Sequence, residues 1–122
     1  MSGERHHRYW RVYRTAGGHR IIRDELGRLS SHDYAKVRAA MDEVVELGLR
    51  AGKPLRNVIR EIDAEGEHGV TYRMLFATDG HLMQMLLAPV LFNKKSPKTP
   101  PRLIDLAETR LRDWRLRRTT LT

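Results

Sequence analysis

The sequence predicts one α+β domain in the order β-α-α-β-β-β-α, with a mostly antiparallel sheet, a helical hairpin and a C-terminal helix. Three observations support this fold class. Apolar residues recur at helical spacing between about residues 19 and 48. From about residue 55 to 92 they instead alternate or form the short dense runs of strands. Pro100-Pro101 then precedes a third helical pattern, as proline favours the first helical turn.

The first half predicts a strand followed by two helices. Residues 9–14 are rich in strand-forming side chains, and the two glycines after them end the strand. We expect a short helix over residues 19–29. Ser30 can cap the next helix, with Asp33 three residues later as an approximate capping box. The apolar stripe expected on that helix is Tyr34, Val37, Met41 and Val44.

The second half predicts three strands and a last helix. We expect strands over 55–62, 70–77 and 81–92, with a charged loop at 63–69 and a tight turn at Asp79-Gly80. Pro89 lacks a backbone donor and predicts a bulge in the last strand. The helix over 102–117 packs an apolar stripe on the sheet, so all helices are expected on one side.

Charge is concentrated at the two ends of the chain. Residues 1–23 carry 6 basic and 1 acidic side chains, and residues 94–122 carry 9 and 3, whereas residues 24–93 carry 8 and 11. With a net charge of +8, this polarity favours a polyanionic partner, nucleic acid above all. The alternative is a solvated surface that keeps the protein soluble.

Composition limits the remaining classes. The chain has no cysteine, which excludes disulfides and thiolate chemistry and fits a reducing, cytoplasmic location. No run of about 18 apolar residues predicts a membrane span, and the basic N-terminus does not resemble a secretory signal. The six histidines show no metal-ligand spacing, so we expect neither a metal nor a cofactor.

The most informative stretch is residues 92–101, which we name the lysine–proline segment. It places Lys94, Lys95 and Lys98 within five residues, among three prolines that limit its conformations. These ammonium groups can neutralise phosphates, and one crowded by the others could transfer protons. Phe92 can stack on a base or belong to the core.

Arg73 is the second candidate. It alternates with Tyr72 and Met74, so it projects from the opposite sheet face, which we expect to be open and concave. A guanidinium on a rigid strand matches two phosphate oxygens. The alternative is an arginine that covers apolar surface with its stem. His68 and His81, at loop ends, are candidate acids or bases or ordinary loop histidines.

Two stretches carry a resemblance to a known family: Tyr72–Phe76 before a hairpin, and Phe92–Pro100 followed by a helix with an Ala-x-x-Arg pattern, Ala107 to Arg110. With the order of elements, they closely resemble the RelE/ParE toxin superfamily, and best its HigB-like, phage-derived branch. The resemblance covers about residues 8–117, so residues 1–122 are expected to form a single RelE-like toxin domain.

The resemblance implies a toxin of a type II toxin–antitoxin system. Its activity would be that of a ribosome-dependent mRNA interferase, a metal-free endoribonuclease in which a ribose 2′-OH attacks the adjacent phosphate. Implied partners are mRNA, the ribosome and a helix-turn-helix antitoxin. Carried over by position, the implied catalytic residues are Arg73, Lys95 and Lys98, and the implied RNA-binding residues are Lys94, Phe92 and Arg60.

One departure keeps alternatives open. Many members have Glu-Leu-Arg on the second strand, whereas this chain has Glu61-Ile62-Asp63, with an aspartate at the usual position of a cation. Asp63, expected in a loop, could act as a base or mark lost activity. The alternative functions are a ParE-like gyrase inhibitor and a non-catalytic phage or nucleic-acid-binding regulator.

Overall fold

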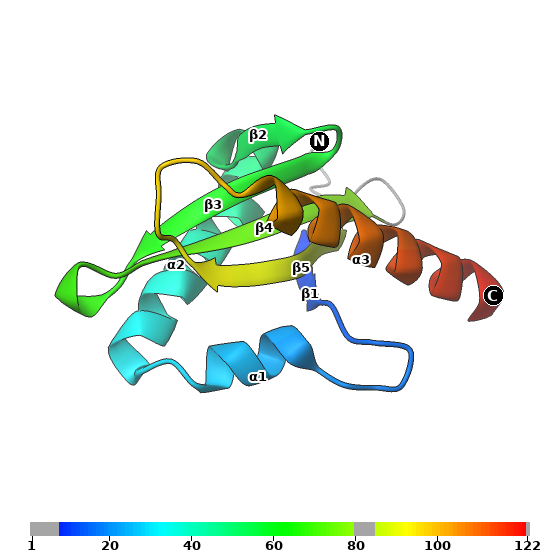
Figure 1. The fold of residues 1–122 in the computed structure, drawn as a ribbon, viewed down its shortest axis with the longest axis horizontal. Coiled ribbons are helices and arrows are strands. Elements are labelled where there is room, and N and C mark those ends of the chain that lie inside the picture. Colours follow the sequence, from blue (N-terminus) through cyan, green and yellow to red (C-terminus); the bar gives the residue numbers. More distant parts are fainter. Residues whose placement is uncertain (1–7, 80–84, 122) are drawn as a thin grey trace, which may run out of the picture.

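Five strands form one sheet in the spatial order β1-β5-β4-β3-β2 in the computed structural model, which describes residues 8–79 and 85–121 (Figure 1). The strands are β1 (Tyr9–Val12), β2 (Lys53–Arg56), β3 (Ile59–Glu65), β4 (Thr71–Asp79) and β5 (Met85–Asn93). β1 pairs in parallel with β5, and the other neighbours pair antiparallel. The α+β fold class predicted from the sequence is confirmed.

Three α-helices cover the sheet on both faces: α1 (Ile21–Gly27), α2 (Ser31–Leu47) and α3 (Pro101–Leu121). Figure 1 shows the α1–α2 hairpin on one face and α3 crossing the other. The expectation of helices on one side was therefore wrong, because β4 and β5 are apolar on both faces and each face needs a cover. Within the described ranges, no helix has the length and apolar content needed to cross a membrane.

The start of α2 follows its sequence. The Ser30 hydroxyl accepts a hydrogen bond from the Asp33 amide at 3.1 Å, as the capping prediction requires. The Asp33 carboxylate, however, is buried and accepts from the Tyr72 hydroxyl at 2.6 Å and the Glu67 amide at 2.9 Å. It thereby ties the helix to the β3–β4 turn. Tyr34, expected in the buried stripe, is instead 44% exposed.

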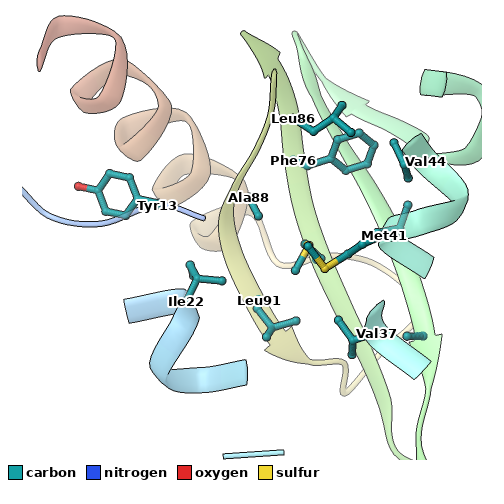
Figure 2. Close-up of a cluster of buried hydrophobic side chains, with 12 residues drawn as sticks. Tyr13, Ile22, Val37, Met41, Val44, Phe76, Leu86, Ala88 and Leu91 are labelled. Atoms are coloured by element: carbon teal, nitrogen blue, oxygen red, sulfur yellow. The ribbon is translucent and has the colours of Figure 1, made fainter. Parts of the chain in front are cut away.

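The core has two parts, one on each face of the sheet. Figure 2 shows the larger part, where Val44 of α2 lies beside Phe76 and Val37, further along the helix, lies on the side of Leu91. Phe76 is fully buried and meets Trp10 edge-on, with ring centroids 5.4 Å apart. On the other face lies the predicted apolar stripe of α3, which consists of Leu103, Ala107, Leu111 and Trp114. Ala107 and Leu111 are buried, and the other two are partly buried.

The segment predicted as one strand over 55–62 is a hairpin. β2 and β3 are separated by a turn at Asn57, whose φ is 53°, a left-handed conformation that asparagine tolerates. The Asn57 amide and the Arg56 guanidinium both donate to Glu108 of α3, at 2.6 Å each. No Asn-Gly or Asp-Gly pair marked this turn, so the sequence pattern missed it.

The bulge predicted at Pro89 is present. Leu75 pairs with Val90 and Ala77 pairs with Leu87, so three residue steps on β5 face two on β4. The Pro89 carbonyl accepts a hydrogen bond from Arg110 of α3 at 2.8 Å. Because the extra residue reverses which side chains face α3, it brings Phe92 to the same face as its partner Arg73. The Asp79-Gly80 turn lies partly outside the described residues.

Candidate functional site

Arg73 lies at the centre of a buried polar network, in the middle of the sheet and beneath the lysine–proline segment. Only 4% of the residue is exposed. Its Nε and Nη2 atoms donate to the two carboxylate oxygens of Asp63, at 2.6 and 2.8 Å. Glu61 contributes a second carboxylate, with Oε2 at 3.3 Å from Nε. Asp63 therefore occupies the two donors that could otherwise bind a phosphate group in the same bidentate way.

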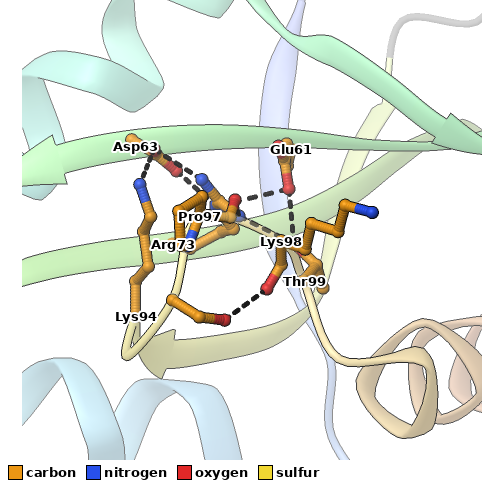
Figure 3. A network of polar contacts seen from close by, with 8 residues as sticks. Glu61, Asp63, Arg73, Lys94, Pro97, Lys98 and Thr99 are labelled. Carbon is orange, nitrogen blue, oxygen red and sulfur yellow. Dashed lines mark hydrogen bonds and ion pairs between the residues drawn. The ribbon is translucent and has the colours of Figure 1, made fainter.

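The same guanidinium fixes the lysine–proline segment. Arg73 Nη1 donates to the Pro97 carbonyl and to the Thr99 hydroxyl, both at 3.0 Å. The Thr99 hydroxyl in turn donates to Glu61 at 2.6 Å (Figure 3). We name Glu61, Asp63, Arg73 and Thr99 the arginine network. The expectation that Arg73 lies on an open concave face was wrong, because this segment folds over it.

Asp63 belongs to strand β3 and not to a loop, which corrects its predicted placement. It lies directly opposite Arg73 in the β3–β4 register. The hydrogen bond from Arg73 holds the pKa of the Asp63 carboxyl below its ordinary value, and Lys94 adds to this effect. Lys94 Nζ lies 3.7 Å from Asp63 Oδ2. Two cations thus surround an aspartate at the position where the resembled pattern has an arginine.

Lys95 and Lys98 differ from Lys94, whose ammonium group pairs with Asp63. Both are exposed, and in the described part of the chain neither ammonium has an ion pair or hydrogen bond. Their backbone is nevertheless held, because Ser96 Oγ donates to the Lys98 carbonyl at 2.9 Å and Arg73 binds the carbonyl between them. The structure therefore presents two uncompensated cations on a fixed support.

The other two predicted RNA contacts lie elsewhere. Phe92 is half-buried and packs against the core beneath α3, which fits the core alternative. Arg60 alternates with Glu61 and shares a register position with Phe76, so it faces α2. Its Nη1 donates to the carbonyls of Leu49 and Gly52, at 3.2 and 3.1 Å. Arg60 is therefore on the sheet face opposite Arg73, and the structure does not bring the two together.

Of the two candidate histidines, the structure describes only His68, which makes no contact with this network among the described residues. His68 is in the β3–β4 turn, with 89% of its side chain exposed and Glu67 3.7 Å away. His81 lies outside the described residues. Across residues 8–79 and 85–121, no three histidine or carboxylate side chains gather as a metal site.

Glu61 and Thr99 are parts of the network that sequence reasoning did not assign. Both are buried, with 6% and 7% of the residue exposed. A usable indication was present, since Glu61 and Asp63 alternate on one strand and so share a face. Two carboxylates on one face can pair with an arginine on the neighbouring strand, and such pairing is what a charged side chain needs in order to be buried. Thr99 had no comparable indication.

The arrangement of a small five-stranded sheet, an α1–α2 hairpin and a C-terminal helix is consistent with a RelE-like toxin fold. The family model described as phage derived protein Gp49-like (DUF891) matches residues 24–112. The chain belongs to this family, which is part of the RelE/HigB-like toxin superfamily. No curated protein matches the chain.

Proposed function

We propose that this protein is a HigB-like toxin of a type II toxin–antitoxin system and acts as a ribosome-dependent mRNA interferase. The observation that supports this is the lysine–proline segment, which Arg73 holds in place and which presents Lys95 and Lys98 without an ion pair to any residue that the structure describes. Fixed cations stabilise developing phosphate charge without reorganising during the reaction. The family to which the chain belongs supports the toxin assignment.

The reaction that suits such a site is internal transesterification of RNA. A base removes the proton from a ribose 2′-OH, and the oxygen attacks the adjacent phosphorus. The P–O5′ bond breaks, and the leaving oxygen takes up a proton. The products are a 2′,3′-cyclic phosphate and a 5′-OH. Lys95 and Lys98 would stabilise the charged phosphorane, and Lys94 would contact the flanking backbone.

Arg73 has a different role in this proposal from the one expected of it. It is a positioning residue, since its four hydrogen bonds go to Asp63, Pro97 and Thr99. It sets the place of the lysines and does not contact RNA. Arg60 is outside the proposed site, and Phe92 supports it from the core.

The proposed partners follow from the same assignment. The ribosome would supply substrate positioning, which a small surface loop does not provide on its own. A helix-turn-helix antitoxin would hold the toxin inactive.

Primer extension on a defined mRNA in a purified translation system tests the proposal. Breaks that occur only with ribosomes, with 5′-OH and cyclic-phosphate ends, are the expected result. A folded protein that yields no breaks with or without ribosomes would contradict it.

One observation favours a second candidate, a non-catalytic nucleic-acid-binding member of the fold. Asp63 and Glu61 bring two carboxylates to Arg73, so its charge is compensated inside the protein. If this compensation has abolished the nuclease activity, the wild-type protein binds RNA but does not cleave it. Asp63→Asn, which releases one carboxylate charge, would then produce breaks that the wild type does not.

A further inference from the structure

A second basic feature lies away from the lysine–proline segment. It is a hollow of about 510 Å³ between β1, α1 and α2, to which α3 contributes Trp114. None of residues 92–101 lines it, and no aspartate or glutamate does. Five arginines surround it, which are Arg11, Arg14, Arg20, Arg23 and Arg38. We name this feature the arginine hollow.

Most of this charge is uncompensated. Arg38 pairs with Asp42, with Nε 3.3 Å from Oδ1. Arg11 lies over the Tyr9 ring, 4.9 Å from its centroid. The side chains of the remaining three arginines are exposed and make no hydrogen bond or ion pair within the described residues. Those three are Arg14, Arg20 and Arg23.

The hollow also has an aromatic and apolar wall. Trp10 is fixed there, because its Nε1 donates to the Met41 carbonyl at 2.8 Å. Tyr34 lines the same hollow, with 44% of the residue exposed. Its helical spacing predicted that it would be buried in the core, but it is not. An exposed ring among free guanidinium groups is the combination that proteins use to stack a base and hold its phosphate.

We propose that the arginine hollow is a nucleotide site, which takes a phosphate ester carrying a flat base. The guanidinium groups match phosphate oxygens in pairs, and the volume is in the range of small-ligand pockets. A carboxylate-rich peptide would satisfy the arginines and leave the Tyr34 ring without a flat partner. The site stands independently of the proposed cleavage, since it shares no residue with the lysine–proline segment.

The chain supplies its own reporter for this site. It contains two tryptophans, Trp10 and Trp114, and both line the hollow. Intrinsic fluorescence therefore reports on occupation of the hollow. Because Trp114 also packs on the α3-side cluster that includes Phe92, the variants below are needed to assign the signal to the hollow. Titration with uridine triphosphate, pyrophosphate, a short oligouridine and a glutamate-rich peptide covers the possible ligand classes.

The test variant is Arg20→Ala/Arg23→Ala, and the matched control is Arg50→Ala/Arg112→Ala, which removes the same charge from exposed arginines that do not line the hollow. Saturable quenching by the uridine ligands is expected, with affinity reduced at least about tenfold in the test variant and little changed in the control. Circular dichroism checks that both variants are folded.

The ligand series separates the two sources of a nucleotide. Oligouridine binding more tightly than the triphosphate indicates a nucleic-acid segment, and equal or weaker binding indicates a free nucleotide. Three results would overturn the site: no saturable change with any uridine ligand at about 1 mM, equal affinity in the test variant, or tighter binding of the glutamate-rich peptide.

Discussion

At the scale of single residues, Arg73 decides how the candidate site is built. Its guanidinium is buried, and it joins β3, β4 and the lysine–proline segment through Asp63, Thr99 and the Pro97 carbonyl. Arginine suits this position because its planar fork donates side by side to both carboxylate oxygens of Asp63 and, from Nη1, to two further acceptors, whereas the three donors of an ammonium group radiate from one atom. The residue expected to bind substrate instead holds the segment that presents the lysines.

Arg73→Ala should destabilise the protein as well as change its activity. The substitution leaves Glu61 and Asp63 without their shared cation, and removing one partner of a buried ion pair typically costs about 3–5 kcal/mol. Urea unfolding measures the loss. Arg112→Ala, at an exposed position on α3, is the control and should stay within about 0.5 kcal/mol of wild type. A loss below about 1 kcal/mol for Arg73→Ala would contradict the structural role.

Asp63 should make stability depend on pH on the acid side. Its folded-state pKa is lowered, chiefly by the hydrogen bond from Arg73, so its contribution is present above the unfolded pKa, about 3.9, and is lost as the pH falls through the folded value. The free energy of unfolding of Asp63→Asn should therefore fall furthest below wild type above about pH 5 and converge with it in stronger acid. A difference that is constant from neutral to acid pH would contradict this.

At the scale of elements, one hydroxyl links the lysine–proline segment to two side chains of the sheet. Thr99 accepts from Arg73 and donates to Glu61, and it is buried. Thr99→Val keeps the shape and removes both bonds, so backbone amides of residues 94–99 should exchange hydrogen faster, with a stability loss of about 1–3 kcal/mol. Thr99→Ser retains the hydroxyl and should restore protection. Equal exchange in all three proteins would show that the segment is fixed by other contacts.

The elements also show which structural features could be predicted from the sequence and which could not. The helix cap at Ser30, the bulge at Pro89 and the apolar stripe of α3 follow from local chemistry, and each is present. The turn at Asn57 and the burial of Arg73 depend on contacts with α3 and with residues 97–99, which lie far along the chain. Hydrophobic periodicity and secondary-structure propensity are local properties and do not predict contacts between distant residues.

At the scale of the whole molecule, the two groups of cations that carry the proposals lie on separate surfaces. One is the pair Lys95 and Lys98 beside the arginine network, and the other is the arginine hollow at β1, α1 and α2. The candidate chemistry could be proposed from the sequence, because the lysine–proline segment is local. The hollow could not, since its arginines come from β1, α1, α2 and the connection between β1 and α1, and their meeting depends on the fold.

The salt dependence of RNA binding should report how many phosphate contacts the lysine pair makes. Each single-strand phosphate contact contributes about 0.7 to the slope of log affinity against log salt. Lys95→Ala/Lys98→Ala should therefore lower the slope for a short oligouridine by about 1–1.5, measured by fluorescence anisotropy with a labelled RNA. An unchanged slope would mean that neither lysine contacts phosphate.

Primer extension on one defined mRNA, translated by purified ribosomes in the presence of the protein, is the decisive experiment. It compares wild type, Lys95→Ala/Lys98→Ala and Lys36→Ala/Lys53→Ala. The last variant removes the same charge from exposed lysines on α2 and β2. We expect ribosome-dependent breaks from the wild type and the control, and at least about a hundredfold fewer from the Lys95/Lys98 variant, because preorganised charge is lost. Undiminished breaks from a folded Lys95/Lys98 variant would contradict the claim that these lysines form the site.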